Sequence, residues 1–213
     1  MTERTSAAKL ASEFIGTFFL VLTVVYAVSN KSPLAALGIG AVLMAMVYAG
    51  GHISGAHYNP ALSIAAFVRG RLEAVDLAGY IVAQLAGGLV AALLGLWFFE
   101  NAAGGAYENN EIVKVLVVEA LFTFALGWVM LNVATSKNHE DNHFYGLAIG
   151  FTVAAGVVAV GDISGAVFNP AVALGLSVAK LSAWANLWIY LVAQVVGGVV
   201  AGLAFRAINA DDE

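Results

Sequence analysis

Two Asn-Pro-Ala motifs are the residues whose types and spacing are most informative in this sequence. Proline is favoured at the first position of a helix and asparagine at the capping position before it. Each motif therefore predicts a helix whose cap oxygen accepts a backbone N–H near Leu62 or Val172, with the side-chain amide free to donate. One copy could be only a helix start, but two matched copies argue against that interpretation. The motif residues are Asn59, Pro60, Ala61, Asn169, Pro170 and Ala171.

The residues before the motifs are repeated as well. Residues 51–62 read GHISGAHYNPAL and residues 161–172 read GDISGAVFNPAV, with eight of twelve positions identical. We expect 55–58 and 165–168 to be extended, so that their carbonyls form a row of acceptors. Because helix N-termini carry partial positive charge, central donors beside a wall of acceptors suit a small neutral polar solute and repel cations. The candidate carbonyls belong to Gly55, Ala56, His57, Tyr58, Gly165 and Val167.

The composition places these motifs in a membrane. Of 213 residues, 61% are apolar and 11% charged, whereas soluble proteins are about 25% charged. The mean hydropathy is +0.88. The core of a soluble domain of this size could not bury so many apolar residues. The net charge of −5 offers no basic surface for nucleic acid, and the absence of cysteine excludes disulfides and thiolate metal sites.

Six apolar stretches are long enough to cross a hydrocarbon core of about 30 Å. Two shorter stretches begin at the prolines of the motifs, and a helix of about ten residues spans only about 15 Å. Each short helix can therefore reach halfway across the bilayer. The six stretches are 10–29, 34–50, 77–99, 112–133, 144–160 and 184–207, and the short ones are 60–68 and 170–179.

The two halves of the chain are an inverted repeat. The offset of 110 between the motifs also relates YIVAQLAGG to YLVAQVVGG, whose glycine pairs indicate close helix packing. The repeats run approximately over 10–100 and 112–207 and form one domain, 1–213. Because each half has three spans, the second half enters from the opposite face. The short helices then meet near the midplane, where irregular backbone is tolerated only if it is buried or lines a path.

Charged and aromatic residues predict how the chain sits in the bilayer. Six basic residues share a side with the termini and three lie on the other, which places both termini in the cytoplasm. Glu13 and Glu119 lie within apolar helices, where acids usually face the interior, although Glu13 is near enough to a span end to snorkel. Aromatic residues expected at the headgroups are Tyr80, Trp97, Tyr107, Tyr145, Trp184 and Trp188.

These motifs resemble the aquaporin, or major intrinsic protein, family, and the resemblance covers nearly the whole chain. It implies an all-α membrane protein with six transmembrane helices plus two re-entrant half-helices, one pore per subunit and a homotetramer. It also implies passive permeation without a cofactor, metal or energy coupling. The resemblance also implies that Glu13 and Glu119 accept hydrogen bonds from the re-entrant loops. The expected location is the plasma (inner) membrane.

The sequence departs from the family pattern at the selectivity filter. Members of the family usually carry arginine three residues after the second asparagine, where this chain has Val172. The other filter positions carried over by spacing are Ile39, Val157 and Ala166, so all four are apolar. Such a filter is less polar, and either wider or prone to dewetting. Glycerol facilitators usually have aspartate where this chain has Ala173, which disfavours a pore specialised for glycerol.

The resulting hypothesis is a passive channel for water and other small neutral solutes or gases, such as ammonia, carbon dioxide, hydrogen peroxide and small polyols. A secondary transporter is the alternative from another class, because inverted repeats with broken helices also build transporters. A tetramer that has lost conduction is a third possibility. No catalytic constellation is found. A metal or pH-sensing role for the polar stretch 139–143 is disfavoured relative to a solvated loop.

Overall fold

The computed structural model of the chain describes residues 5–99 and 111–212. Six of its helices are long and apolar enough to cross a membrane, as the sequence predicts. They are α1 (Ser6–Ser29), α2 (Ala35–Ser54), α4 (Ala74–Phe98), α5 (Ile112–Ala134), α6 (Tyr145–Ser164) and α8 (Leu187–Ile208). The short helices are α3 (Pro60–Arg69), α7 (Pro170–Val178) and the 3-10 turns η1 (Lys137–His139) and η2 (Trp184–Asn186).

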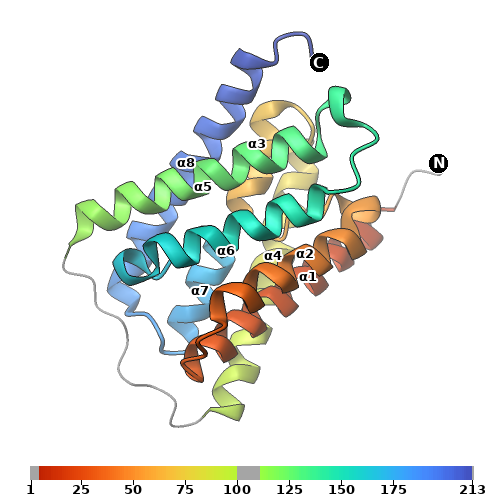
Figure 1. The fold of residues 1–213 in the computed structure, drawn as a ribbon. Coiled ribbons are helices and arrows are strands. Elements are labelled where there is room, and N and C mark those ends of the chain that lie inside the picture. Colours follow the sequence, from red (N-terminus) through yellow and green to blue (C-terminus); the bar gives the residue numbers. More distant parts are fainter. Residues whose placement is uncertain (1–4, 100–110, 213) are drawn as a thin grey trace.

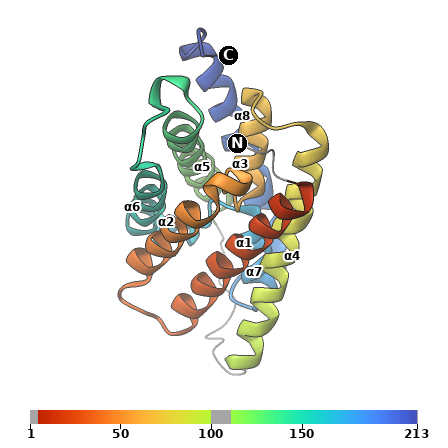
Figure 2. The same cartoon turned by 90° about the vertical axis from the view of Figure 1, so that its right-hand side faces the viewer.

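The short helices α3 and α7 enter the molecule from opposite ends, as an inverted repeat requires. Figures 1 and 2 show α3 towards the end that carries both termini and α7 towards the other end. Each packs against a long helix of the other half, α3 on α8 and α7 on α4. Within the halves, α1 packs on α4 and α5 on α8, while α2 and α6 pack across the repeat. The two halves are therefore interlocked by their half-helices.

Two helices extend further than the apolar runs predict. α2 continues to Ser54 rather than ending at residue 50, and α6 continues to Ser164 rather than ending at 160. Each ends at a glycine in the left-handed conformation, Gly55 with φ 85° and Gly165 with φ 82°. Glycine adopts this conformation without the steric cost that other residues bear. The chain therefore turns away from both helices at equivalent points.

The glycine pairs bring helix backbones into close contact, as predicted. A Cβ placed on Gly87 would lie 2.5 Å from the carbonyl oxygen of Phe14, and one on Gly197 would lie 2.6 Å from that of Ala120. A Cβ on Gly198 would collide with the carbonyl of Ala61, the last residue of the first motif. Gly198 of α8 thus sets how closely half-helix α3 approaches, and Gly197 does the same for α5.

Gly198→Ala is expected to destabilise the fold by about 1–3 kcal/mol, because the added methyl group must displace backbone rather than a flexible side chain. Gly38→Ala is the matched control: a Cβ there meets nothing within 4 Å. In a helix interior alanine is favoured over glycine by about 0.5–1 kcal/mol. Thermal unfolding of the two variants in detergent checks the prediction, which is wrong if both variants unfold at the same temperature.

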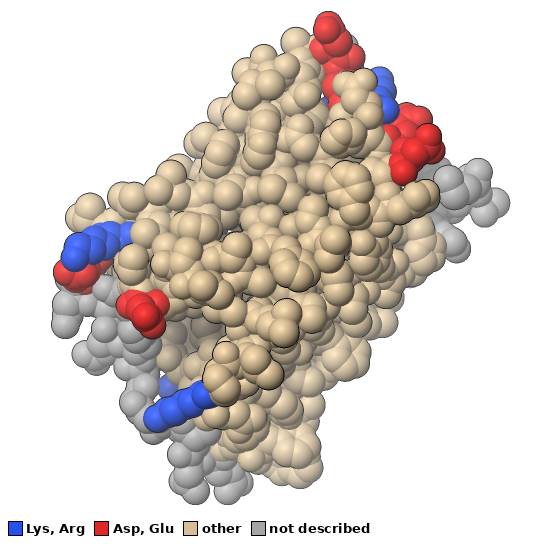
Figure 3. All heavy atoms as spheres, viewed as in Figure 1, with Lys and Arg blue, Asp and Glu red and all other residues tan. Residues whose placement is uncertain are grey.

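The surface fits a membrane span. In Figure 3 the charged residues gather at two opposite ends of the visible face, with a broad uncharged band between them. Trp97, Trp184 and Trp188 are exposed, consistent with their expected place near the headgroups. The same expectation is wrong for Tyr80, which is buried and donates its hydroxyl to the carbonyl of Ser54 at 2.7 Å. Tyr107 lies outside the described residues.

Candidate conduction pathway

The two asparagines cap the half-helices as predicted. Asn59 Oδ1 accepts the backbone N–H of Ala61 at 2.9 Å and that of Leu62 at 3.4 Å. In the second motif Asn169 Oδ1 accepts the N–H of Ala171 at 2.9 Å, one residue earlier than the expected Val172. Both prolines occupy the first helical turn. The positive ends of α3 and α7 therefore lie at the two asparagines.

The side-chain amides of the asparagines also link the two halves. Asn59 Nδ2 donates to the carbonyl of Phe168 and Asn169 Nδ2 donates to the carbonyl of Tyr58, both at 2.9 Å. The expectation that these amides are wholly free to donate is therefore wrong. An amide has two N–H donors, so each asparagine keeps a second one. The tips of the two half-helices are held together near the centre of the molecule.

Glu13 anchors the first re-entrant loop from inside α1. Its side chain is fully buried, so the alternative that it snorkels to a membrane surface is wrong. Four donors converge on its carboxylate, two on each oxygen. They are Ser54 Oγ at 2.6 Å, His57 N at 3.0 Å, Tyr58 N at 2.7 Å and Gln84 Nε2 at 2.8 Å.

Glu119 repeats this arrangement in the second half. It is also fully buried, and its four donors come from the equivalent positions. They are Ser164 Oγ at 2.6 Å, Val167 N at 2.9 Å, Phe168 N at 2.8 Å and Gln194 Nε2 at 2.9 Å. Successive backbone N–H groups that face one anion form a nest. Each carboxylate thereby fixes the shape of one re-entrant loop.

The loops are not extended as expected. Ala56, Tyr58, Ala166 and Phe168 all have positive φ, between 50° and 54°. Such values are uncommon outside glycine and cost on the order of 1–3 kcal/mol each. The carboxylates offset this cost, because only a bent loop turns adjacent N–H groups towards one anion.

Peptide geometry then fixes the direction of the carbonyls. In a trans peptide the C=O points opposite to the N–H of the next residue. Because the N–H groups of His57 and Tyr58 face Glu13, the carbonyls of Ala56 and His57 point away from it. The carbonyl of Tyr58, predicted to be a free acceptor, instead accepts the Asn169 amide.

A narrow cavity of about 90 Å³ lies beside the asparagines. A cavity needs about 10–15 Å³ to hold one water, so this cavity has room for several waters. All four predicted filter residues line it: Ile39, Val157, Ala166 and Val172. Both asparagines, Gly165, Val167 and His57 line it too. Its lining residues include no aspartate, glutamate, lysine or arginine.

A wider vestibule of about 1050 Å³ shares His57 with this cavity. Its lining includes His57 and Gly55, which is the counterpart of Gly165 in the first repeat. Charged residues from the end of the molecule that carries the termini line it too, among them Lys9, Arg71 and Asp76. His57 lines both spaces, so it marks their junction. Two residues with predicted pore carbonyls, Ala56 and Tyr58, line neither the cavity nor the vestibule.

Sequence reasoning did not find the side chains that orient His57. Gln84 Nε2 donates to Ser63 Oγ at 2.9 Å as well as to Glu13, and Ser63 Oγ lies 3.1 Å from His57 Nδ1. These contacts hold the imidazole of His57 in place through its Nδ1 atom. The sequence alone indicated a role only for the carbonyl of His57. The sequence signal that could have indicated these contacts is the glutamine repeated in both halves, Gln84 and Gln194.

Comparison with known proteins decides the family. Residues 1–205 match the family described as Major intrinsic protein. The chain belongs to the major intrinsic protein family. It is 36% identical to glycerol uptake facilitator protein-like 6 of Lactiplantibacillus plantarum (strain ATCC BAA-793 / NCIMB 8826 / WCFS1), over 96% of this chain and 99% of that protein. It is also 37% identical to aquaporin NIP1-1 of Zea mays, over 94% and 74% respectively.

A solved structure shows the same fold. The X-ray structure of the aquaglyceroporin from Plasmodium falciparum superposes with a TM-score of 0.84 at 22% sequence identity, covering 97% of this chain and 98% of that one. Major intrinsic proteins are passive membrane channels rather than enzymes. The chain is accordingly a channel protein whose fold class, six spans with two re-entrant half-helices, agrees with the sequence prediction.

Proposed function

We propose that the narrow cavity and the vestibule form one conduction path for water and small neutral solutes. The observation that carries this proposal is that one residue, His57, lines both spaces. The four apolar filter side chains and the two asparagines line the narrow cavity together with His57, which also lines the vestibule. The path would therefore pass both asparagines before it widens towards the end of the molecule that carries the termini.

The centre of this path favours neutral solutes over cations. The N-termini of α3 and α7 each contribute about half a positive charge beside the asparagines. The remaining N–H of each asparagine amide can donate to a passing oxygen, which would orient a water and interrupt a proton wire. The carbonyls of Ala56 and His57, and of Ala166 and Val167, point away from the buried glutamates and can accept along the loops.

The filter should favour solutes that need few hydrogen bonds. Ile39, Val157, Ala166 and Val172 offer only apolar side chains, and no fixed cation stands at this point. Ammonia, carbon dioxide and hydrogen peroxide fit such a lining, together with water. Small polyols remain candidates because two similar proteins are named for glycerol or as an aquaglyceroporin, whereas Ala173 disfavours a pore specialised for glycerol.

Solute uptake into proteoliposomes tests this selectivity. We expect hydrogen peroxide and ammonia to enter faster than into empty liposomes, with flux proportional to concentration, and sodium or protons to remain excluded. Saturating uptake that requires a proton or sodium gradient would instead identify a secondary transporter. If water and every solute crossed proteoliposomes and protein-free liposomes at the same rate, the protein would be the non-conducting tetramer.

The setting of the channel is part of the same proposal. We place it in the plasma (inner) membrane as a homotetramer, with both termini in the cytoplasm. The charge asymmetry supports this orientation, because Arg69, Arg71 and Lys137 gather around the C-terminal tail. Tetramers are typical of the family.

A further inference from the structure

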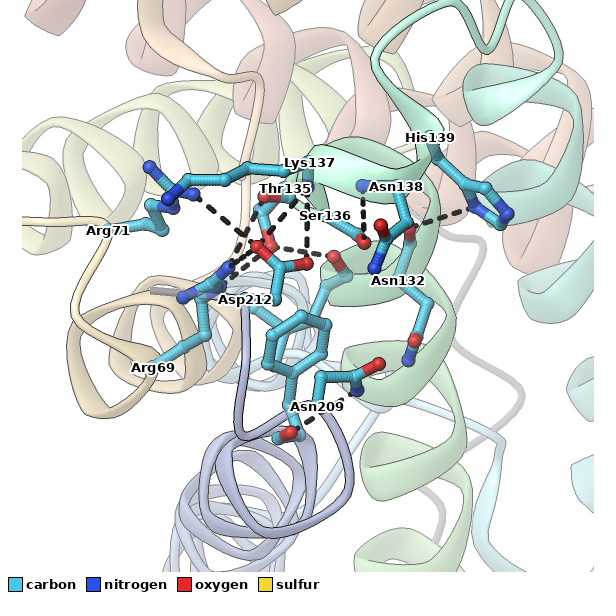
Figure 4. A network of polar contacts seen from close by, with 12 residues as sticks. Arg69, Arg71, Asn132, Thr135, Ser136, Lys137, Asn138, His139, Asn209 and Asp212 are labelled. Atoms are coloured by element: carbon cyan, nitrogen blue, oxygen red, sulfur yellow. Dashed lines mark hydrogen bonds and ion pairs between the residues drawn. The ribbon is translucent and has the colours of Figure 1, made fainter.

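The C-terminal tail beyond α8 carries a buried acid, Asp212. The side chain of Asp212 is 1% exposed and its Oδ1 lies 2.9 Å from Arg69 Nη2 and 3.7 Å from Arg71 Nη2. The backbone N–H of Lys137 donates to both carboxylate oxygens, at 3.2 and 3.1 Å. Figure 4 shows this acid between the end of α3 and the segment that follows α5. The Ser136 hydroxyl, the Lys137 N–H and the Arg69 guanidinium hold the pKa of Asp212 below its usual range.

Arg69, which binds this acid, is buried as well. Its side chain is 4% exposed, and the guanidinium lies 4.4 Å from the ring centre of Phe205 in α8. Arg69 Nε donates to Thr135 Oγ1 at 3.1 Å and Nη2 to the carbonyl of Thr135 at 3.4 Å. A buried charge of this kind is tolerated only with its partner, because removing the partner leaves it uncompensated.

This buried pair lies directly behind the wall of the vestibule. Gly70, Arg71, Thr135, Ser136 and Lys137 line the vestibule, whereas Arg69 and Asp212 do not. Gly70 follows Arg69 in the chain, and Thr135 accepts hydrogen bonds from the Arg69 guanidinium. One layer of residues therefore separates the Arg69 guanidinium from the mouth of the path.

We propose that Asp212 is a positioning residue that holds the Arg69 guanidinium behind the vestibule wall and so keeps this mouth of the channel open. The inference rests on the proposed function, because it assigns the vestibule to the conduction path. Without the negative charge of Asp212, the buried Arg69 guanidinium has no close counter-charge in the described part of the chain and only neutral partners, among them the two oxygens of Thr135 and the Phe205 ring. The vestibule is lined by the residues that adjoin Arg69, so we expect the guanidinium to turn into it, as long cationic side chains do when they reach for water.

Asp212→Asn tests the proposal in proteoliposomes. We expect osmotic water permeability per folded channel to fall by about threefold or more, because a guanidinium in the mouth raises the barrier to passage. Asp211→Asn is the matched control, since Asp211 is the exposed neighbour of the same type. Its permeability should equal that of the unchanged protein. Equal permeability of both variants would overturn the proposal.

The double variant Arg69→Met with Asp212→Asn separates this role from a general effect of the tail. It lacks the tail carboxylate, but methionine leaves no buried unpaired charge and can still pack on Phe205. We expect its permeability to return to that of the unchanged protein. Reduced permeability in the folded double variant would overturn the proposal, even where Asp212→Asn alone fails to fold. No flux in the unchanged protein would instead contradict the proposed function.

Discussion

Replacing Glu119 with alanine is expected to abolish the folded channel. The change removes the only acceptor that the described structure gives to four buried donors, the Ser164 hydroxyl, the N–H groups of Val167 and Phe168, and the Gln194 amide. Each buried donor left unsatisfied costs about 1–3 kcal/mol. Four such losses are comparable with the whole stability of a typical domain, about 5–15 kcal/mol. The left-handed residues of the loop would also lose the anion that stabilises them.

Glu119→Gln sharpens this test because it keeps the shape of the side chain. Each carboxylate oxygen of Glu119 faces two donors, so a glutamine amide can satisfy only two of the four and turns its NH₂ group towards the others. We expect a folded yield and thermal stability between those of the unchanged protein and of Glu119→Ala. Glu140→Ala, at an exposed site, is the control. Full stability and permeability in Glu119→Ala would contradict the anchoring role.

Val172→Arg is expected to narrow the channel to solutes no larger than water. Val172 is 4% exposed and lines the narrow cavity with Ile39, Val157 and Ala166, so a longer side chain here must occupy that cavity. We expect the flux of urea or a small polyol, wherever the unchanged protein conducts it, to fall by about tenfold, equivalent to about 1.4 kcal/mol in barrier height. Water flux should fall less, because water is smaller and can bond to the guanidinium.

Val172→Met is the matched variant, since methionine has a similar reach without a charge. If size alone sets the barrier, both variants reduce solute flux equally. If the guanidinium adds an electrostatic barrier, only Val172→Arg lowers any leak of cations. Unchanged solute flux in a correctly folded Val172→Arg protein would remove Val172 from the filter.

Most of the architecture could be predicted from the sequence, because apolar length and helix capping are local signals. Hydropathy fixed the number of spans, and the Asn-Pro pairs marked the starts of α3 and α7. The ends of α2 and α6 were predicted too early. The apolar runs stop near 50 and 160, yet both helices continue until a left-handed glycine ends them, at Gly55 and Gly165. Hydropathy does not report backbone dihedral angles.

The parts that could not be predicted depend on contacts between distant residues. The bent loops follow from buried Glu13 and Glu119, which lie more than forty residues earlier in the chain. Tyr80 near the start of a span looked like an interfacial aromatic, although its counterpart Tyr190 makes the same bond to a loop carbonyl, that of Ser164. Asp212 lies in a short polar tail without periodicity, and its partner Arg69 is 143 positions away.

Stopped-flow light scattering on proteoliposomes shrinking against an impermeant osmolyte tests the central claim most directly. A continuous path past the four apolar residues and the two asparagines predicts shrinkage much faster than that of empty liposomes, with a low activation energy. Shrinkage no faster than that of empty liposomes, from protein shown to be folded and inserted, would contradict a water-conducting path through this cavity.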